Sequence, residues 1–286
     1  MKKLVQPIKW HGGKYYLRQW ILDLMPPHLH YVEPFFGAGS VLLARDPARD
    51  WMQTSEGKKL PSYLKGCSEV VNDIHEELIN FWRVLQNPQE FLEFQRRVEL
   101  TPFSQREFED AARMPPDADA TERAIRFFIR ARQSRQGLMR DFATLSRTRT
   151  RGRISDQTSA YLGAVEGLTD IHQRLQGVVI LNDDACSVIR KQDGELTLFY
   201  CDPPYHHDTR STTGEYDHEM TEAQHSELLE VLSRIEGRFL LSGYPCALYS
   251  ERERRHGWNR HEKQIDNKAA SGKSKEIKTE CLWCNF

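Results

Sequence analysis

The sequence predicts an α/β protein, in which a doubly wound sheet carries a helical insertion domain. Residues 30–40 read as a strand followed by a glycine-rich turn, and a buried strand at 197–201 ends abruptly in an acid and two prolines. A long, mainly helical stretch separates these two motifs. We expect residues 1–86 and 176–286 to form the sheet domain and residues 87–175 to form the insertion.

Length and composition limit the classes of protein that the chain can represent. Its 286 residues suffice for one large domain with an insertion, and 39% hydrophobic with 28% charged residues is ordinary for a soluble protein. No apolar stretch approaches the roughly 20 residues of a membrane span, and residues 1–7 lack the apolar run of a secretory signal. We therefore expect a cytoplasmic protein with reduced cysteines. The net charge of −1 means that any nucleic acid must be bound by a local basic surface.

The amino-terminal segment Lys9-Trp10-His11-Gly12-Gly13-Lys14 places two glycines between lysines and a tryptophan. Glycine lets a backbone approach a ligand closely, so this segment predicts a ligand-facing loop, although a Gly-Gly turn is also common before a helix. The helix is expected from Lys14 to Leu24, and Pro26-Pro27 ends it.

The segment Val32-Glu33-Pro34-Phe35-Phe36-Gly37-Ala38-Gly39-Ser40 predicts a strand and a glycine turn, with a helix beginning at Val41. This unit opens many doubly wound sheets and places a nucleotide crevice at the turn. The dinucleotide fingerprint requires a third glycine where Leu42 stands, so the pattern favours a nucleoside over a nicotinamide dinucleotide.

An acidic residue follows the second expected strand, residues 69–71. Asp73 occupies the place where such sheets bind ribose hydroxyls. Alternatively, Asp73 and Glu76 form a capping box for a helix over residues 74–85. We prefer ribose binding to helix capping as the role of Asp73, because the glycine turn of a nucleotide site precedes Asp73 in the sequence.

The strand at 178–181 is also followed by acids, in Asn182-Asp183-Asp184. A carboxylate at the carboxyl end of a strand faces the ligand crevice, where Asp184 could accept a hydrogen bond from an adenine amine. The alternative is a cap for the short helix through Val188.

Arginines dominate the end of the expected insertion. Caps at Asn87 and Ser104 predict two helices, a third is expected over 120–133, and one from 158 to 175 leads back to the sheet. Residues 130–153 hold eight arginines against one acid, an excess of seven charges that favours a phosphate-binding surface over a solvated face. Its distal part is expected to be a flexible loop. The arginines expected to contact nucleic acid are Arg126, Arg130, Arg135, Arg147, Arg149, Arg151 and Arg153.

The motif Asp202-Pro203-Pro204-Tyr205 ends the strand at 197–201. Two prolines impose a stiff, extended turn whose carbonyls have no ladder partners. A carboxylate, exposed carbonyls and an aromatic face together make a candidate site. The alternative is a strand terminator with an acidic cap.

The remaining chain predicts a mobile polar loop over 206–220, a helix capped by Thr221 and Gln224, and strands at 239–242, 261–265 and 277–286. Cys281 and Cys284 face opposite sides of the last strand, so they are expected in the core. The histidines show no metal-ligand spacing, and no metal site is predicted.

The three motifs at 9–14, 32–40 and 202–205, in this order, resemble those of adenine-specific DNA methyltransferases of the Dam-like class, in the α arrangement of motifs. The resemblance implies a Rossmann-like methyltransferase sheet, S-adenosylmethionine as donor and double-stranded DNA as substrate. A companion restriction endonuclease is a candidate partner, and a monomer is expected.

The resemblance also assigns roles to individual residues. Trp10 and Lys14 would line the donor site. Asp73 would bind the ribose hydroxyls of the donor, and Asp184 would bind its adenine. Asp202 would serve both the donor site and catalysis. The segment that would wrap the methionine and ribose comprises Pro34, Phe35, Phe36, Gly37 and Gly39.

The chemistry agrees with these residues. An exocyclic adenine amine is a poor nucleophile, and hydrogen bonds to the Asp202 carboxylate and the Pro203 carbonyl would make it more nucleophilic. Tyr205 would stack on a base flipped out of the duplex. Alternatives are methylation of the exocyclic amine of cytosine, a DNA-binding module without activity and a nicotinamide dehydrogenase. Methylation at the cytosine ring carbon is not expected, because Cys201 lies within the strand.

Overall fold

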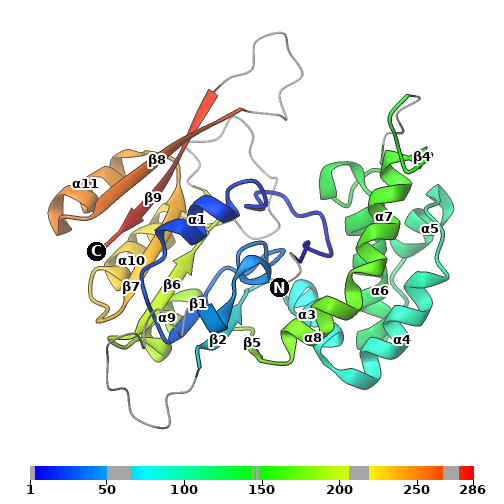
Figure 1. The fold of residues 1–286 in the computed structure, drawn as a ribbon, viewed down its shortest axis with the longest axis horizontal. Helices are drawn as coiled ribbons and strands as arrows, with labels where there is room; N and C mark the ends of the chain where they lie inside the picture. The colour runs from blue at the N-terminus through cyan, green and yellow to red at the C-terminus, as the bar shows by residue number, and fades with distance from the viewer. Residues whose placement is uncertain (1–3, 50–65, 144, 146–147, 206–218, 267–276) are drawn as a thin grey trace. The chain divides into compact units, whose positions relative to one another are not determined.

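A computed structural model of the chain describes residues 4–49, 66–143, 145, 148–205, 219–266 and 277–286 (Figure 1). These residues fall into two compact units, which we call the helical unit and the sheet unit. The helical unit comprises Met1–Leu24, Gly37–Asp46 and His75–Asn182. The sheet unit comprises Met25–Phe36, Pro47–Ile74 and Asp183–Phe286.

Six strands of the sheet unit lie side by side in the order β2-β1-β6-β7-β9-β8. The strands β2, β1, β6 and β7 are parallel, whereas β9 runs antiparallel to both β7 and β8. Their bounds are β1 His30–Glu33, β2 Ser68–Asn72, β6 Thr197–Cys201, β7 Arg238–Gly243, β8 Asn259–Asp266 and β9 Ile277–Cys284. The helices are α9 Ala185–Gln192, α10 Glu222–Leu232 and α11 Ala247–His256. This mostly parallel sheet confirms the predicted α/β class.

The parallel strands end together at one edge of the sheet. All five residues of β6 are buried, as expected for a parallel strand covered on both faces. β1 pairs in register with β6 through Tyr31 and Leu198, and with β2 through Glu33 and Val71. The residues that follow these three strands, Pro34, Asp73 and Asp202, therefore emerge at the same edge.

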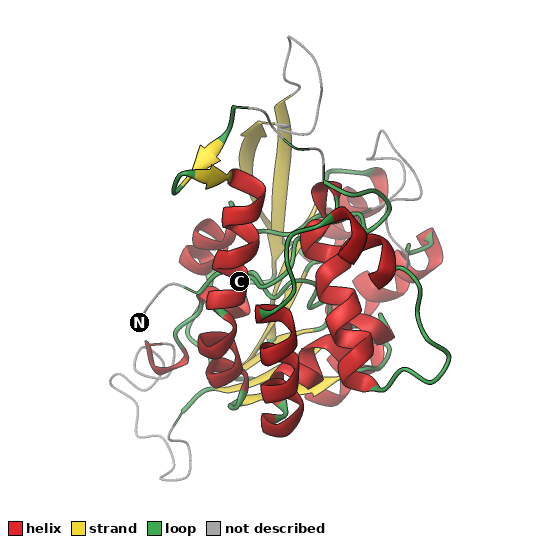
Figure 2. Cartoon of the chain, turned by 90° about the vertical axis from the view of Figure 1, so that its right-hand side faces the viewer, coloured by secondary structure: helices red, strands yellow, loops and turns green. Residues whose placement is uncertain are grey.

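The helical unit contains most of the helices of the described chain, drawn red in Figure 2. They are α1 Arg18–Leu24, α3 Glu76–Gln86, α4 Pro88–Glu99, α5 Gln105–Ala111, α6 Ala120–Gln133, α7 Asp156–Glu166 and α8 Leu168–Leu175. The unit also holds the 3-10 turns η1 Leu42–Ala44 and η2 Arg135–Gly137, and the strands β3 Thr150–Arg151, β4 Ile154–Ser155 and β5 Val178–Leu181. None of the helices in the described ranges is long and apolar enough to cross a membrane.

Side-chain caps begin these helices where the sequence predicts them. The Asn87 side chain accepts hydrogen bonds from the backbone N–H groups of Gln89 and Glu90, at 3.0 and 3.2 Å. Ser104 caps α5 in the same way, by accepting from the N–H of Arg106. Each cap satisfies a backbone donor that has no partner within its helix.

Three helix predictions need correction. The predicted helix over 158–175 is two helices, α7 and α8, with Gly167 between them. The helix expected at Val41 is only the single 3-10 turn η1. α1 begins at Arg18, four residues later than expected, because the chain first makes a turn in which the Lys14 carbonyl accepts from the N–H groups of Leu17 and Arg18.

The distal part of the arginine-rich segment was predicted to be a loop, but residues 150–155 form a β-hairpin whose strands, β3 and β4, have two residues each. The hairpin leads directly into α7 (Figure 2). Arg151 pairs with Ile154, and the two residues between them have positive φ, 60° at Gly152 and 67° at Arg153. Positive φ at both turn residues matches the right-handed twist of the two strands. The turn therefore presents Arg153 at the tip of the hairpin.

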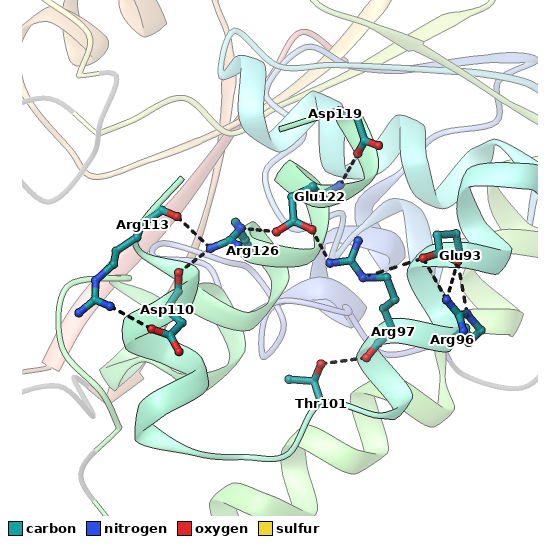
Figure 3. Close-up of polar contacts among 9 residues, drawn as sticks. All are labelled: Glu93, Arg96, Arg97, Thr101, Asp110, Arg113, Asp119, Glu122 and Arg126. Atoms are coloured by element: carbon teal, nitrogen blue, oxygen red, sulfur yellow. Dashed lines mark hydrogen bonds and ion pairs between the residues drawn. The ribbon is translucent and has the colours of Figure 1, made fainter. Parts of the chain in front are cut away.

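A network of ion pairs joins α4, α5 and α6 in the helical unit (Figure 3). Glu122 lies between Arg97 and Arg126 and accepts a hydrogen bond from each guanidinium. Desolvation raises the pKa of the Glu122 carboxyl, but the two arginines outweigh it and hold that pKa below its ordinary value. Arg126 also donates to the backbone carbonyl of Arg113 at 2.9 Å. These contacts use several of the hydrogen-bond donors of the Arg126 guanidinium within the helical unit.

Candidate active site

Asn72 organises the sheet edge at which the site residues emerge. Its side chain is fully buried and donates to the carbonyls of Pro34 and Asp183, both at 3.0 Å. Its side-chain oxygen accepts from the N–H of Asp183 at 2.9 Å, and its own carbonyl accepts from the N–H of Phe36 at 2.8 Å. One side chain thus holds together the segments that follow β1 and precede α9. The sequence reading missed this role, and the only local signal was an asparagine at the last position of a strand.

The cap residue of the following helix is His75, not Asp73. α3 begins at Glu76, and its cap is His75, whose Nδ1 accepts a hydrogen bond from the N–H of Leu78 at 3.2 Å. The capping alternative for Asp73 is therefore wrong. The partly exposed Asp73 stands at the carboxyl end of β2, and its assignment to ribose hydroxyls stays a prediction.

For Asp184 the capping alternative is confirmed. Its Oδ2 accepts from the N–H of Ser187 at 2.8 Å, at the start of α9. The preceding Asp183 pairs with Lys191 at 2.7 Å, and the hydrogen bond from Lys191 lowers the pKa of the Asp183 carboxyl. Asp184 is exposed, so a cap and a contact with a ligand are compatible. Its assignment to the donor adenine remains a prediction.

The glycine turn and the amino-terminal motif meet within the helical unit. Gly37 and Gly39 have φ of 51° and 69°, a conformation that strains every residue with a Cβ. A Cβ on Gly37 would lie 3.2 Å from both Cδ1 and Nε1 of Trp10. The Trp82 indole N–H also donates to the Gly37 carbonyl. The structure therefore brings together Trp10 and Gly37, two of the predicted donor-site residues.

Two further rings hold the Trp10 side chain. The His75 ring meets it edge to face with centroids 5.7 Å apart, and the Phe127 ring lies 6.1 Å away. His75 thus both caps α3 and contacts Trp10, a combination that no local pattern indicates. Lys14 is 7% exposed, and its Nζ donates to the Gly12 carbonyl at 3.0 Å, so this lysine folds back onto its own loop.

The motif Asp202-Pro203-Pro204-Tyr205 leaves the sheet directly after β6. Asp202 and Pro204 are partly exposed, Pro203 is buried and Tyr205 is 8% exposed. The Tyr205 hydroxyl donates to Glu280 Oε1, and its ring packs edge to face on Tyr244. Burial, followed by the Glu280 and Asp202 charges, raises the pKa of Tyr205 well above its ordinary value. The hydroxyl therefore stays protonated as a hydrogen-bond donor.

Burial disfavours the thiolate form of the cysteine beside this motif. Cys201 is fully buried, and burial raises its pKa well above that of an ordinary thiol, so the reactive thiolate is disfavoured. Cys281 and Cys284 are buried, free thiols of β9, which confirms the prediction that they belong to the core.

The predicted DNA-contacting arginines divide into two groups. Arg135, Arg149, Arg151 and Arg153 are exposed, and the last three lie in or beside the β3–β4 hairpin. Arg126 and Arg130 are partly buried and donate to backbone carbonyls, Arg130 to that of Met139 at 2.9 Å. Arg147 and most of the expected polar loop, residues 206–218, lie outside the described residues.

The mostly parallel sheet with its helices defines an α/β protein of the Rossmann-like methyltransferase class. The chain belongs to the D12 class N6 adenine-specific DNA methyltransferase family, whose model matches residues 10–266. This membership confirms the resemblance inferred from the three motifs. It also excludes the nicotinamide dehydrogenase alternative.

Individual relatives agree with the family. The chain is similar to the type II methyltransferase M1.LlaDCHI of Lactococcus lactis subsp. cremoris, with 26% identity over 203 residues, 69% of this chain and 64% of that protein. It is 37% identical to a Vibrio cholerae DNA adenine methylase over 98 residues, 34% of this chain and 28% of that protein. The matched region thus spans less than two thirds of either relative. A Salmonella typhi DNA adenine methylase is 23% identical over 262 residues, 88% of this chain and 84% of that protein.

Proposed function

We propose that this chain transfers a methyl group from S-adenosylmethionine to the exocyclic N6 amine of adenine in double-stranded DNA, by base flipping. The observation that carries the proposal is the placement of Asp202. Its partly exposed carboxylate follows directly after β6, at the sheet edge where β1 and β2 also end. Residues 1–86 and 176–286 would serve catalysis, and residues 87–175 would serve DNA recognition.

Asp202 and Pro203 supply the acceptors that the amine needs. The N6 lone pair is delocalised into the adenine ring, and two hydrogen bonds from the amine to these acceptors localise it on nitrogen. Bound S-adenosylmethionine would supply the methyl group to this nitrogen and would keep the electron pair of the methyl–sulfur bond on its sulfur. Asp202 then holds the proton that leaves the nitrogen until solvent takes it up. The buried, protonated Cys201 supports a mechanism without a covalent enzyme intermediate.

The donor-site proposal rests on the backbone at the glycine turn. S-adenosylmethionine supplies an electrophilic methyl group when it is bound. Gly37 and Gly39 have no Cβ atoms and adopt positive φ, so the backbone of this turn can lie close to a nucleoside. Trp10, which packs on Gly37, would offer the donor an aromatic face. The other residues that we assign to the donor are Lys14, Pro34, Phe35, Phe36, Asp73, Asp184 and Asp202.

The DNA surface that we propose centres on the β3–β4 hairpin. Arg149, Arg151 and Arg153 are exposed there, and exposed guanidinium groups bind phosphates by releasing counterions from the duplex. Arg147 adjoins them in the sequence, and the exposed Arg135 lies further along the same arginine-rich segment. The enzyme would act on the duplex as a monomer.

Nucleoside mass spectrometry tests the proposal after duplex DNA is incubated with the purified chain and S-adenosylmethionine. We expect N6-methyladenine, and we expect its loss in Asp202→Ala. Methylcytosine as the only product would instead support the cytosine amine as substrate. If the chain binds DNA but never methylates it, the chain is a DNA-binding module.

A further inference from the structure

Tyr205, the last residue of the catalytic motif, is joined to a residue 75 positions away in the sequence. Its hydroxyl donates to Oε1 of Glu280, a β9 residue that is only 2% exposed. A buried carboxylate is costly unless hydrogen-bond donors satisfy it, and the Tyr205 hydroxyl is one such donor. The contact therefore joins the motif, which follows β6, to the strand β9.

The sheet gives Glu280 a fixed position. The next residue, Cys281, pairs with Gly243 at the end of β7, and β7 pairs with β6 through Leu241 and Cys201. β7 thus lies between the strand that carries the motif and the strand that carries Glu280. A carboxylate on a strand inside a sheet is held more firmly than one on a loop.

A second contact fixes the ring of Tyr205. Tyr244 follows β7 directly, and its ring meets that of Tyr205 at a centroid distance of 4.8 Å and an interplanar angle of 78°. This edge-to-face arrangement is the favourable one for two aromatic rings. Glu280 thus holds the hydroxyl of Tyr205 while Tyr244 packs against its ring.

We propose that Glu280 is a positioning residue for methyl transfer, which anchors Tyr205 and thereby sets the orientation of the Asp202 carboxylate and the Pro203 carbonyl. This inference rests on the proposed function. Proline fixes φ at two of the three positions between Cys201 and Tyr205, so this segment is a stiff arm. Because the arm is held by β6 at one end and by Glu280 at the other, loss of the Glu280 contact tilts the two acceptors. A displacement of about 1 Å at a reacting group can cost 100-fold in rate.

If Glu280 had only a structural role, loss of any comparable buried hydrogen bond should lower kcat as much as loss of the Glu280 contact. Tyr200 provides the control for this comparison. Tyr200 is a buried β6 residue whose hydroxyl lies 3.0 Å from the buried Ser242 hydroxyl. Tyr200→Phe removes a buried tyrosine hydrogen bond beside the motif and keeps both partners of the Tyr205–Glu280 contact. It therefore reports what the loss of such a bond costs while that contact is kept.

The experiment compares the wild type with Glu280→Ala, Glu280→Gln, Tyr205→Phe, Tyr200→Phe and the double variant Tyr205→Phe/Glu280→Ala. Steady-state methylation of duplex DNA gives kcat and the KM for S-adenosylmethionine, and thermal unfolding gives Tm. We expect Glu280→Ala to lower kcat at least tenfold with the donor KM within twofold of wild type. Glu280→Gln keeps an oxygen that accepts from Tyr205, so it should recover most of kcat. The double variant should be no slower than the slower single variant.

Three results would overturn the role of Glu280. These are an unchanged kcat in Glu280→Ala, a loss in Tyr200→Phe as large as that in Glu280→Ala, or multiplicative losses in the double variant. An inactive wild type would refute the proposed function itself. The two failures are therefore distinguishable.

Discussion

The indole N–H of Trp82 donates to the carbonyl oxygen of Gly37 at a distance of 3.0 Å. Trp82 is a fully buried residue of α3, so the glycine turn is fastened to the core of the helical unit. Trp10 also packs on the same glycine. A turn held by two side chains presents its backbone in one conformation, which lowers the conformational entropy that is lost when a ligand binds.

Gly37→Ala should destabilise the chain and weaken binding of the donor. A Cβ at this position meets a positive φ of 51° and the Trp10 indole at 3.2 Å. We expect a loss of about 2 kcal/mol in the free energy of unfolding, because left-handed strain alone costs about 1 to 2 kcal/mol for a residue with a Cβ. Calorimetry should show weaker binding of S-adenosylhomocysteine, the product of the donor.

Gly257→Ala is the matched control for Gly37→Ala. Gly257 ends α11 with a φ of 66°, and a Cβ there would meet nothing within 4 Å. This variant should carry the backbone strain but keep the affinity for S-adenosylhomocysteine. Equal affinity in both alanine variants would contradict the placement of the donor at Gly37.

Glu122→Gln should destabilise the chain at neutral pH. The carboxylate lies between Arg97 and Arg126, its side chain is 19% exposed, and the amide removes the negative charge that the two guanidinium groups share (Figure 3). Removing one partner from a largely buried network costs about 2 kcal/mol. Chemical denaturation of the wild type and the variant measures the loss.

The pH dependence of this loss has a definite sign. Desolvation opposes ionisation of Glu122, but the hydrogen bonds of Arg97 and Arg126 lower its pKa in the folded state. The carboxylate thus contributes stability that is present above the unfolded pKa and is lost as the pH falls through the folded pKa. The difference between wild type and Glu122→Gln should shrink below about pH 4.5. Glu93→Gln, at a side chain 46% exposed, should change stability by less than about 0.5 kcal/mol.

Lys9 should make stability rise with pH in the alkaline range. Desolvation, followed by the charge of Arg132, lowers the pKa of Lys9 from 10.5 to about 8, although its Nζ donates to Gln157 at 3.1 Å. Between pH 8 and pH 10.5 the unfolded chain therefore binds a proton that the folded chain does not, and stability increases with pH. Relative to Lys9→Met, the wild type should gain on the order of 1 kcal/mol across this window, since Lys9 is only partly buried. A constant difference from pH 7 to pH 11 would contradict the shift.

Replacement of Arg149, Arg151 and Arg153 by alanine should weaken DNA binding and reduce its salt dependence. These side chains are exposed in or beside the hairpin. The slope of log K against log salt changes by about 0.9 for each phosphate contact, so three lost contacts remove roughly 2.7. Fluorescence anisotropy on a labelled duplex at several salt concentrations measures both effects.

The control for this prediction removes the same number of charges elsewhere. Arg96, Arg106 and Arg113 are about 70% exposed. Arg96 and Arg106 each pair with an acid of their own helix, and Arg113, which follows α5, pairs with Asp110 of that helix. Their alanine variant should bind DNA nearly as the wild type does. If both triple variants lose the same salt slope, net charge and not the hairpin determines the binding.

Local patterns in the sequence predicted the features that short segments determine. The buried strand at 197–201, the cap at Asn87 and the capping box at Thr221 all occur where expected, because each depends on neighbouring residues alone. α11 was missed because Tyr249 is its only buried residue, which leaves no apolar stripe in the sequence. The hairpin turn was missed because Gly-Arg is an unusual pair at two positions of positive φ.

The contacts within the candidate site were beyond prediction for a different reason. The bond between Tyr205 and Glu280 spans 75 residues, and that between Asn72 and Asp183 spans 111. His75 is not a preferred cap, and its ring reaches Trp10 from a distant part of the sequence. These contacts depend on how the strands and helices are ordered in space. The motifs identified the site residues, and only the folded chain shows which of them touch.

The position of β9 affects how this protein is made on the ribosome. Among the described strands β9 comes after β8 in the sequence, yet it lies between β7 and β8, and its residues pair with both. While residues 277–284 are still inside the exit tunnel, the side of β7 that awaits β9 has no strand to pair with. Exposed strand edges recruit other chains, so a pause in synthesis before β9 leaves the tunnel should favour aggregation of the unfinished polypeptide.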